Sequence, residues 1–192
     1  MDTCFERCFP LSLKYEGGAK YTNIPQDRGG PTKYGIALNT FAKDTGDLDL
    51  FDLDGDGEIT ANDIKMLDYD RAKEIYKKYF WDKMYLDEIN SCKKAFLVFD
   101  STLNHGPSGS CGLVQKTLIR MNLMSSDEYD KIWGPHTRDM LNQADEDIFV
   151  SMFQQTRTDY YNAIVAKRPN QSIFLKGWLS RVSQTSADVE TL

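Results

Sequence analysis

The chain has 192 residues, of which 41% are hydrophobic and 27% charged, which is the balance of a soluble globular protein and excludes disordered and fibrous classes. The length allows one domain with a proper core, and no apolar run approaches the roughly 20 residues that span a bilayer. The net charge of −6 is concentrated, because residues 44–70 hold ten acidic residues and one lysine, so we expect no preference for a polyanion such as nucleic acid.

The N-terminal segment MDTCFERCFPLSLKYEGG contains acids, a proline and no long apolar core, which is not the pattern of a secretory signal. We therefore expect synthesis in the cytosol, no membrane insertion, and release by another agent if the protein acts outside. The four cysteines, Cys4, Cys8, Cys92 and Cys111, show no CxxC spacing. They are expected to be reduced and packed, and a Cys92–Cys111 bridge after export is left open.

Most of the chain has helical periodicity. Phe5 to Tyr15 predicts a helix with a kink or restart at Pro10, and Gly17-Gly18 is a stop signal. Glycine, proline, threonine and tyrosine between residues 18 and 40 favour short strands and turns. Further helices are predicted over 71–84, 95–103, 109–122, 143–167 and 174–184. The sum is a mainly α domain with a small β-rich lobe near its N-terminus.

Glu16 is the first candidate catalytic residue, expected in the last turn of the first helix. The partial negative charge at a helix C-terminus and the flanking Tyr15 and Tyr21 both favour a protonated carboxyl. A general acid needs such a carboxyl near neutral pH. The glycines after Glu16 would leave the acid accessible to a bulky substrate.

Asp27 follows in the turn PQDRGGPTKYG, and Thr32 and Tyr34 come just beyond it. A carboxylate on the opposite wall of a cleft can activate a water, and a hydroxyl can help to hold it. One acid and one base of this kind are the apparatus of glycoside hydrolysis. The residues alone also fit a solvated glutamate near a helix end and an ordinary turn aspartate.

The pattern EGG…D.GGPTKYGI resembles the signature of glycoside hydrolase family 108, the lysozyme-like N-acetylmuramidases found in phage endolysins. The resemblance covers nearly the whole chain and continues with EIYKKYFWD (74–82), FDSTLNHG (99–106), Gln115, WGPHTRDML (133–141), RTDYY (157–161) and FLKGWLSRV (174–182). It implies an α+β lysozyme-like fold in which 1–192 form one catalytic domain of two lobes. Within it, 95–182 resemble a peptidoglycan-binding segment.

Carried over, the resemblance implies that Glu16 is the catalytic general acid. The Glu…Asp…Thr order is also similar to the triad of phage lysozymes, which gives Asp27 the role of base and Thr32 that of holding water. Tyr34 competes with Thr32 as the third polar partner. Asn104 in FDSTLNHG is expected either to contact an acetamido sugar or to be satisfied inside a buried helix.

Other residues of the later motifs receive structural roles. His105 departs from the small polar residue usual at its place in the motif, and a lone histidine is more often structural than catalytic. Trp178 and Arg181 are expected to close the core rather than to bind sugar.

The segment DLDGDGEITAND fills the ligand positions of an EF-hand loop within an insertion over 49–68. Its converging carboxylates would repel one another without a cation, so we expect one bound Ca²⁺. Position 12 carries an aspartate in place of the usual glutamate, which predicts weaker affinity or tolerance of Mg²⁺, and no amphipathic helix precedes the loop. The expected ligands are Asp52, Asp54, Asp56, Glu58 through its backbone carbonyl, Thr60 and Asp63.

Taken together, the sequence predicts a monomeric endolysin that hydrolyses the β-1,4 bond between N-acetylmuramic acid and N-acetylglucosamine, with peptidoglycan glycan strands as partner. It would be made in the host cytoplasm, reach the wall through a membrane hole made by another phage protein, and respond to calcium. Two alternatives stay open: a lytic transglycosylase that uses Glu16 alone, and a non-catalytic, calcium-stabilised cell-wall-binding protein.

Overall fold

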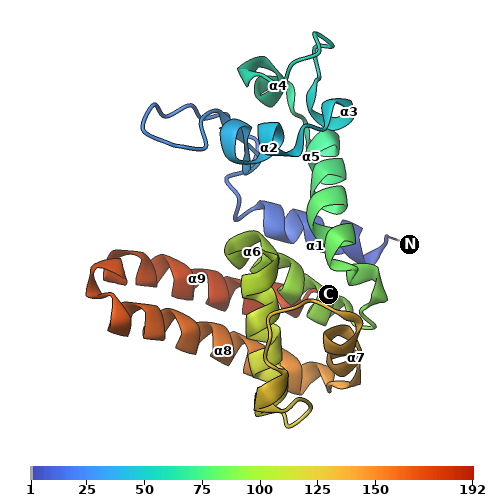
Figure 1. Cartoon of the computed structure of the whole chain (residues 1–192), viewed down its shortest axis with the longest axis vertical. Helices are drawn as coiled ribbons and strands as arrows, with labels where there is room; N and C mark the ends of the chain where they lie inside the picture. The colour runs from blue at the N-terminus through green and yellow to red at the C-terminus, as the bar shows by residue number, and fades with distance from the viewer. Residues whose placement is uncertain (1) are drawn as a thin grey trace. The chain divides into compact units, whose positions relative to one another are not determined.

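The computed structural model describes residues 2–192, which form two compact units. The larger unit contains residues 2–8 and Phe80–Leu192, and the smaller unit contains Phe9–Tyr79. Helices dominate both units, as Figure 1 shows, and the described residues form one two-stranded sheet, which lies in the smaller unit. The expected mainly α fold with a small β-rich part near the N-terminus is therefore confirmed.

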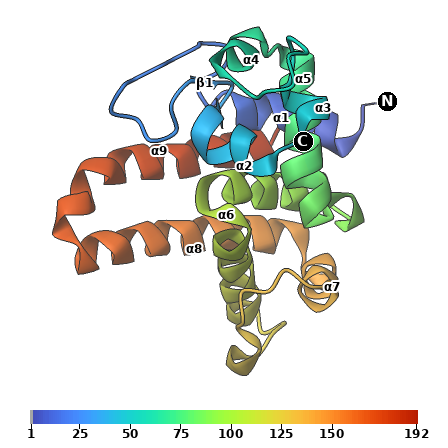
Figure 2. The same ribbon diagram turned by 45° about the horizontal axis from the view of Figure 1, so that its top comes forward.

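The larger unit is built around a long helix and an antiparallel helical hairpin. Figures 1 and 2 both show α8 and α9 lying side by side, and α6 and α9 pack against α8. The Oγ of Ser91 caps α6 by accepting from the backbone N–H of Lys94, and Asp145 caps α8 in the same way. The helices of this unit are α6 (Cys92–Arg120), α7 (Pro135–Gln143), α8 (Glu146–Lys167) and α9 (Ser172–Val189).

Helix α6 is interrupted once, at Gly106. The φ of Gly106 is 70°, and Pro107 follows it, so the backbone leaves helical geometry and then starts again. The break falls between the two helices expected over 95–103 and 109–122. The sequence thus predicted two helices where the structure has one helix with a kink.

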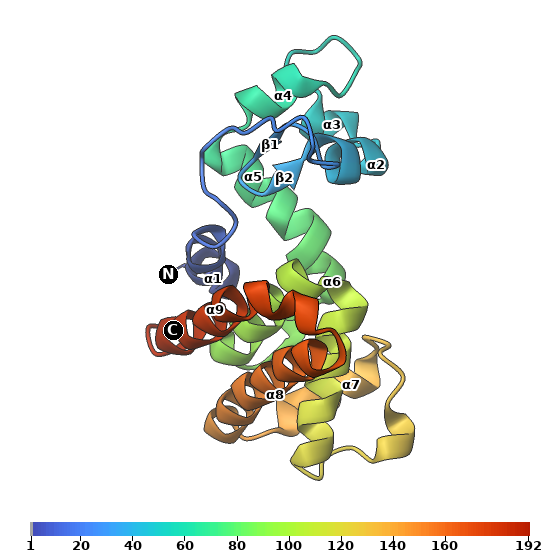
Figure 3. The ribbon, with the colours of Figure 1, turned by 90° about the vertical axis from the view of Figure 1, so that its left-hand side faces the viewer.

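The smaller unit holds a β-hairpin surrounded by short helices, as Figure 3 shows. Strand β1 (Thr32–Lys33) pairs with β2 (Ile36–Ala37), and Tyr34 and Gly35 form the turn with φ values of 54° and 74°. Two positive φ values are the mark of a type I′ turn, which matches the twist of the strands. The helices are α2 (Lys43–Thr45), α3 (Leu48–Phe51), α4 (Ala61–Met66) and α5 (Tyr69–Tyr76), with a π-helical turn, η1 (Leu38–Ala42), after β2.

Helix α1 (Cys4–Leu13) contributes residues to both units and runs through Pro10 without ending there. Its apolar face is buried, with Phe5 and Cys8 in the larger unit and Phe9 in the smaller one. The Phe5 ring contacts Trp81 and Phe99 edge-on at centroid distances of 5.3 and 6.1 Å. Aromatic packing thus fixes the start of the chain in the larger core.

The cysteines depart from the expectation of four reduced thiols. Cys4 and Cys92 form a disulfide, and the Sγ of Cys8 lies 3.7 Å from that of Cys4 and 3.8 Å from that of Cys92. Cys111 is a free thiol, so the bridge left open between Cys92 and Cys111 is wrong. The pairing depends on the packing of α1 beside the start of α6, which cysteine spacing does not reveal.

No helix formed by residues 2–192 combines the length and the apolar character that a membrane crossing requires.

Candidate functional site

Glu16 lies in the turn that follows α1 rather than in the last turn of the helix. Helix α1 ends at Leu13, and the backbone N–H of Glu16 donates to the Leu13 carbonyl at 3.0 Å. The side chain is half-buried. Gly17 and Gly18 follow with φ values of 84° and 59°, and nothing lies within 4 Å of the place where their Cβ atoms would be. The two glycines therefore turn the chain directly after Glu16, and the space around them is open.

The hairpin turn is held directly against this loop. The backbone N–H of Tyr34 donates to the Gly18 carbonyl at 2.9 Å, and the Tyr76 hydroxyl donates to the Tyr34 carbonyl at 2.8 Å. A Cβ on Gly35 would lie 2.9 Å from the Cβ of Glu16 and 2.7 Å from the Tyr76 hydroxyl oxygen. Only a glycine fits there, so Gly35 sets how closely the hairpin approaches Glu16.

Asp27 is exposed and stabilises its own turn. Its Oδ1 accepts from the backbone N–H of Gly29 at 2.8 Å, and its carbonyl accepts from Gly30 N–H at 3.1 Å. Among the described residues its Oδ2 has no hydrogen-bond partner. One carboxylate oxygen thus holds the turn while the other is available to a water.

Thr32 and Tyr34 differ in what they can offer to a ligand. The Thr32 hydroxyl donates to the Gly30 carbonyl at 2.9 Å, and its backbone pairs with Thr22 in both directions. Its oxygen can still accept a hydrogen bond from water. Tyr34 is 9% exposed, and its backbone connects the hairpin to the Glu16 loop. The structure thus brings Tyr34 to the Glu16 loop and ties Asp27 and Thr32 together through Gly29 and Gly30.

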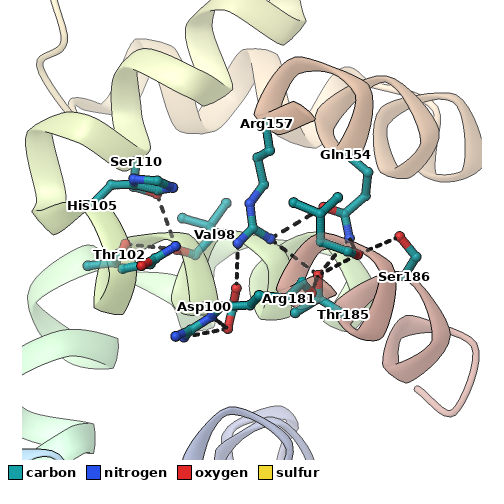
Figure 4. Close-up of polar contacts among 12 residues, drawn as sticks. Val98, Asp100, Thr102, His105, Ser110, Gln154, Arg157, Arg181, Thr185 and Ser186 are labelled. Carbon is teal, nitrogen blue, oxygen red and sulfur yellow. Dashed lines mark hydrogen bonds and ion pairs between the residues drawn. The ribbon is translucent and has the colours of Figure 1, made fainter. Parts of the chain in front are cut away.

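Asn104 belongs to the larger unit and is exposed. Its Nδ2 donates to the Tyr161 hydroxyl at 2.6 Å, whereas its Oδ1 has no partner in the described part of the chain. Asp100, four residues earlier, has no exposed side-chain surface and pairs with Arg157 at 2.9 Å and Arg181 at 2.8 Å (Figure 4). The FDSTLNHG motif therefore divides into a buried structural carboxylate and an exposed amide.

His105 supports this network from the next position. Its Nε2 lies 3.0 Å from the Tyr161 hydroxyl. Burial lowers the pKa of His105 to about 4, with the positive charges of Arg157 and Arg181 adding to the effect and Asp100 opposing it. The imidazole is therefore neutral at physiological pH, in line with the structural role expected for it.

The acidic loop between α3 and α4 brings three of the six expected cation ligands together. Carboxylate oxygens of Asp52, Asp54 and Asp63 lie within 4.8 Å of one another. Asp63 is 1% exposed and holds both ends of the loop, accepting from the backbone N–H groups of Leu53 at 2.7 Å and Thr60 at 2.7 Å. Such a set of hard oxygens fits Ca²⁺ or Mg²⁺.

The other three expected ligands lie at the edge of this loop. The Oδ1 of Asp56 accepts from the backbone N–H of Glu58 at 2.8 Å, and both side chains are exposed. The Thr60 hydroxyl accepts from Asn62 N–H at 3.2 Å and donates to Asp63 Oδ2 at 3.0 Å, which caps α4. The four-residue α3 is the only helix directly before the loop among the described residues, as expected from the absence of an amphipathic pattern there.

The environment of Asp54 in this loop disfavours the charged form of its carboxyl. Partial desolvation raises the pKa of the Asp54 carboxyl, and the negative charges of Asp56, Asp63 and Asp52 raise it further. Burial acts in the same direction on Asp63, but hydrogen bonds from Thr60, Leu53 and Asp54 outweigh it and lower the pKa of Asp63. A bound cation would relieve the repulsion at Asp54.

The loop is connected to the hairpin within the smaller unit. The Nζ of Lys33 in β1 donates to the Lys65 carbonyl in α4 at 2.7 Å, and the Lys65 ammonium lies 5.7 Å from the centre of the Tyr21 ring. Helix α4, which follows the acidic loop, is thus joined to the hairpin by one side-chain hydrogen bond.

One cavity lies elsewhere, between α8 and α9. It has a volume of about 600 Å³ and is lined by residues that include Gln154, Val182 and Val189. None of the predicted catalytic or metal-binding residues lines it. The candidate catalytic site is therefore assigned from the chemistry and the contacts of its residues, and not from the position of this cavity.

Comparison with known families decides the kind of protein. Residues 9–106, 98 of the 192 residues, match the family described as glycosyl hydrolase 108. The chain belongs to this family. It is accordingly a glycoside hydrolase, and every candidate catalytic residue and cation ligand lies in the matched segment.

A second description matches most of the remaining residues of this glycosyl hydrolase 108 member. Residues 112–183 match the family described as "Predicted Peptidoglycan domain". The two matches together make the protein a peptidoglycan-degrading hydrolase. Among curated protein sequences there is no match.

A solved structure shares the fold. The structure of Brucella abortus SagA superposes with a TM-score of 0.70 and 23% sequence identity, covering 97% of this chain and 94% of that one. At this identity the likeness establishes the architecture alone.

Gly35 and Tyr76 lie near Glu16 and were not predicted as site residues. Both lie inside quoted motifs, Gly35 in KYGI and Tyr76 in EIYKKYFWD. A glycine directly after a tyrosine between two short strand patterns is a hairpin-turn signal. No sequence signal shows that this turn touches the glutamate loop.

Proposed function

We propose that this glycosyl hydrolase 108 member cleaves the β-1,4 bond between N-acetylmuramic acid and N-acetylglucosamine, with Glu16 as the general acid. One observation carries the proposal: Glu16 is half-buried in a glycine-flanked turn and is held in place by a hairpin turn that only a glycine permits. A half-buried carboxyl in a positioned loop, followed by two glycines with open space around them, suits protonation of a glycosidic oxygen.

Asp27 is the proposed base, because its free Oδ2 can take a proton from the attacking water. Thr32 would hold that water through its hydroxyl oxygen, and Tyr34 would shape the wall behind it. A separation of about 6.5–9.5 Å between the Glu16 and Asp27 carboxyls in the substrate complex would lead to inversion, and one near ~5 Å to retention.

The test is a turbidity and product assay on purified peptidoglycan. Glu16→Gln should lower the rate of lysis by at least about a hundredfold, because general acid catalysis contributes that much. Glu74→Gln, which removes an exposed carboxylate 2.9 Å from Arg71 in the same unit, is the matched control and should keep full activity. Lysis by Glu16→Gln at the wild-type rate would refute the assignment.

The products separate the hydrolase from the lytic transglycosylase alternative. Hydrolysis adds one water and gives reducing N-acetylmuramic acid ends, whereas a transglycosylase that uses Glu16 alone gives 1,6-anhydro ends. Mass spectrometry of the released muropeptides distinguishes the two products. Loss of activity in Asp27→Asn supports the hydrolase, since the transglycosylase needs no second carboxylate.

We also propose that the loop over 52–63 binds one Ca²⁺ and thereby orders the catalytic part of the smaller unit. The close carboxylates of Asp52, Asp54 and Asp63 support this, and the Lys33–Lys65 hydrogen bond supplies a route to the hairpin. Binding to the folded state would add to its stability.

Calorimetric titration with Ca²⁺ and with Mg²⁺ tests the cation site directly. Asp52→Asn combined with Asp54→Asn should abolish binding, whereas Asp44→Asn, an exposed aspartate outside the loop, should not. Equal melting temperatures and lysis rates in Ca²⁺ and in EDTA would dispose of the proposed regulation.

The biological role that we propose is that of a monomeric phage endolysin, made in the host cytoplasm and released to the wall by another phage protein. The resemblance to the muramidases of phage endolysins supports it. Expression in host cells with and without a membrane-permeabilising holin tests the role, and sedimentation tests the monomer. Lysis that needs no permeabilisation would contradict holin dependence.

A further inference from the structure

Three aromatic rings lie one against the next across α8 and α9. Tyr161 stacks on Trp178 with centroids 5.1 Å apart and planes at 19°, and Phe174 stacks on Trp178 at 5.8 Å and 29°. Tyr161 is buried, Trp178 is half-buried and Phe174 is 48% exposed. This aromatic row thus leads from the core of the larger unit to its surface.

The inner end of the row is held rigidly. The Tyr161 hydroxyl accepts from Asn104 Nδ2 at 2.6 Å and lies 3.0 Å from His105 Nε2. Burial raises the pKa of Tyr161, so the phenol stays neutral. Because the inner end of the row is fixed, a ligand that binds at the exposed end has to immobilise few side chains. The loss of conformational entropy on binding is therefore small.

Trp178 differs from the other two tryptophans in its indole N–H. That of Trp81 donates to Asp87 at 2.8 Å, and that of Trp133 donates to the Met84 carbonyl at 2.6 Å. Within residues 2–192 the indole N–H of Trp178 makes no hydrogen bond, and it is not one of the buried unpartnered atoms. A buried indole N–H normally donates a hydrogen bond within the protein. The Trp178 N–H does not, because it is accessible to solvent, and it can therefore donate to a ligand.

Gly177 exposes the backbone of α9 next to the aromatic row. It lies in the interior of α9, is exposed, and has nothing within 4 Å of the position a Cβ would take. Glycine destabilises a helix interior relative to alanine, and no packing in the structure requires it here. Close approach of a ligand to the helix next to Phe174 and Trp178 would explain it.

We propose that Phe174, Gly177 and Trp178 form a binding site for the glycan strand of peptidoglycan, with Asn104 at its edge. The apolar C–H face of a pyranose packs on the exposed ring, and the acetamido group exchanges hydrogen bonds with the Trp178 N–H and the free Oδ1 of Asn104. The choice of glycan rests on the proposed function and on the match of 112–183, which includes all three α9 residues, to a peptidoglycan domain. Trp178, assigned to the core from the sequence, becomes a contact residue.

Binding is measured with full-length protein that carries Glu16→Gln, so that the ligand is not consumed. The probe is glycan strands from purified peptidoglycan with the peptide stems removed. Phe174→Ala should weaken binding about tenfold, as loss of a central aromatic contact does, without changing the melting temperature. Ile148→Ala, which truncates an apolar residue 52% exposed on α8, is the matched control and should bind normally.

A second variant separates binding from folding. Gly177→Leu should keep or raise the melting temperature, because leucine is the better helix former, and should nevertheless weaken glycan binding at least about tenfold. Ala187→Leu adds the same side chain at another exposed position of α9 and should leave binding unchanged. A purely structural role for Gly177 would move stability and binding in the same direction.

Unchanged glycan binding in Phe174→Ala and Gly177→Leu overturns the proposal. A loss of binding confined to whole sacculi also overturns it, because the surface would then bind peptide stems. If sedimentation showed the wild type to be a dimer and Phe174→Ala a monomer with glycan binding intact, the surface would be a subunit interface and the proposal would be wrong. The proposed hydrolase function is tested separately, because Glu16→Gln should lose turnover while it retains the wild-type affinity for glycan.

Discussion

The carboxylate of Asp100 lies 2.9 Å from the guanidinium of Arg157, and neither side chain has any exposed surface. Arg181 binds the other oxygen of the same carboxylate, and the Nε of Arg157 has no hydrogen-bond partner. Removing one partner leaves the other charge buried without compensation. Asp100→Ala should therefore lower the free energy of unfolding by about 3–5 kcal/mol, measured by chemical denaturation.

An exposed pair supplies the comparison. Arg120 and Asp159 are 2.7 Å apart, but their side chains are 42% and 43% exposed. Asp159→Ala should change the free energy of unfolding by less than about 1 kcal/mol. Equal effects at Asp100 and Asp159 would show that the buried pair is solvated in solution.

Gly35 is expected to control activity through Glu16. Gly35→Ala places a Cβ 2.9 Å from the Glu16 Cβ at a residue with φ of +74°, so both the backbone and the glutamate must shift. We expect a loss of about 1–2 kcal/mol in stability and at least about a tenfold loss in kcat for lysis.

Gly46→Ala is the control for this change. Gly46 has a similar φ of +61°, but nothing lies within 4 Å of its Cβ position. It should show the stability loss and keep kcat. If both variants retained full activity when folded, the hairpin contact would have no part in positioning Glu16.

His105 should make the protein less stable in acid. Its pKa is about 4 in the folded protein and about 6.5 when unfolded, so between these values the unfolded state binds the extra proton. Stability therefore falls as pH drops from 6.5 to 4, by up to about 3 kcal/mol, and this contribution is constant below pH 4.

His105→Gln should remove that part of the pH dependence. The measurement is the free energy of unfolding by urea at several pH values between 4 and 7. Parallel curves for the variant and the wild type would show that His105 is solvated and titrates normally.

The disulfide should contribute to stability, and Cys8 should be able to replace Cys4 in it. Reduction of Cys4–Cys92 is expected to cost about 2–4 kcal/mol, because the bond closes a loop with a sequence separation of 88. In Cys4→Ser, the 3.8 Å between the sulfurs of Cys8 and Cys92 should allow a Cys8–Cys92 bond, detected by peptide mapping.

Cys111→Ser is the redox control. Cys111 is a buried free thiol outside the group formed by Cys4, Cys8 and Cys92, so Cys111→Ser should leave the effect of reductant unchanged. A melting temperature of the wild type that does not respond to reductant would show that the disulfide does not form.

The sequence by itself determined the helical class, the position of the hairpin and the acidic loop, because these depend on local periodicity and turn chemistry. The glycine pair at 17 and 18 and the spacing of Asp52, Asp54 and Asp63 act within a few residues of one another. The GGPTKYGI and FDSTLNHG motifs likewise indicated the glycosyl hydrolase 108 family, which the match over 9–106 shows. The catalytic roles of Glu16, Asp27, Thr32 and Tyr34 remain predictions.

Only the tertiary structure decided which distant residues meet. The Cys4–Cys92 pair, the contact of Gly35 with Glu16 and the burial of Asp100 between Arg157 and Arg181 each join segments whose separation no local pattern encodes. The exposure of Trp178 likewise could not be predicted. A tryptophan on an amphipathic helix gives the same sequence pattern whether its indole N–H is buried or accessible to solvent. The difference arises from packing between helices, which the side chains of both helices fix together.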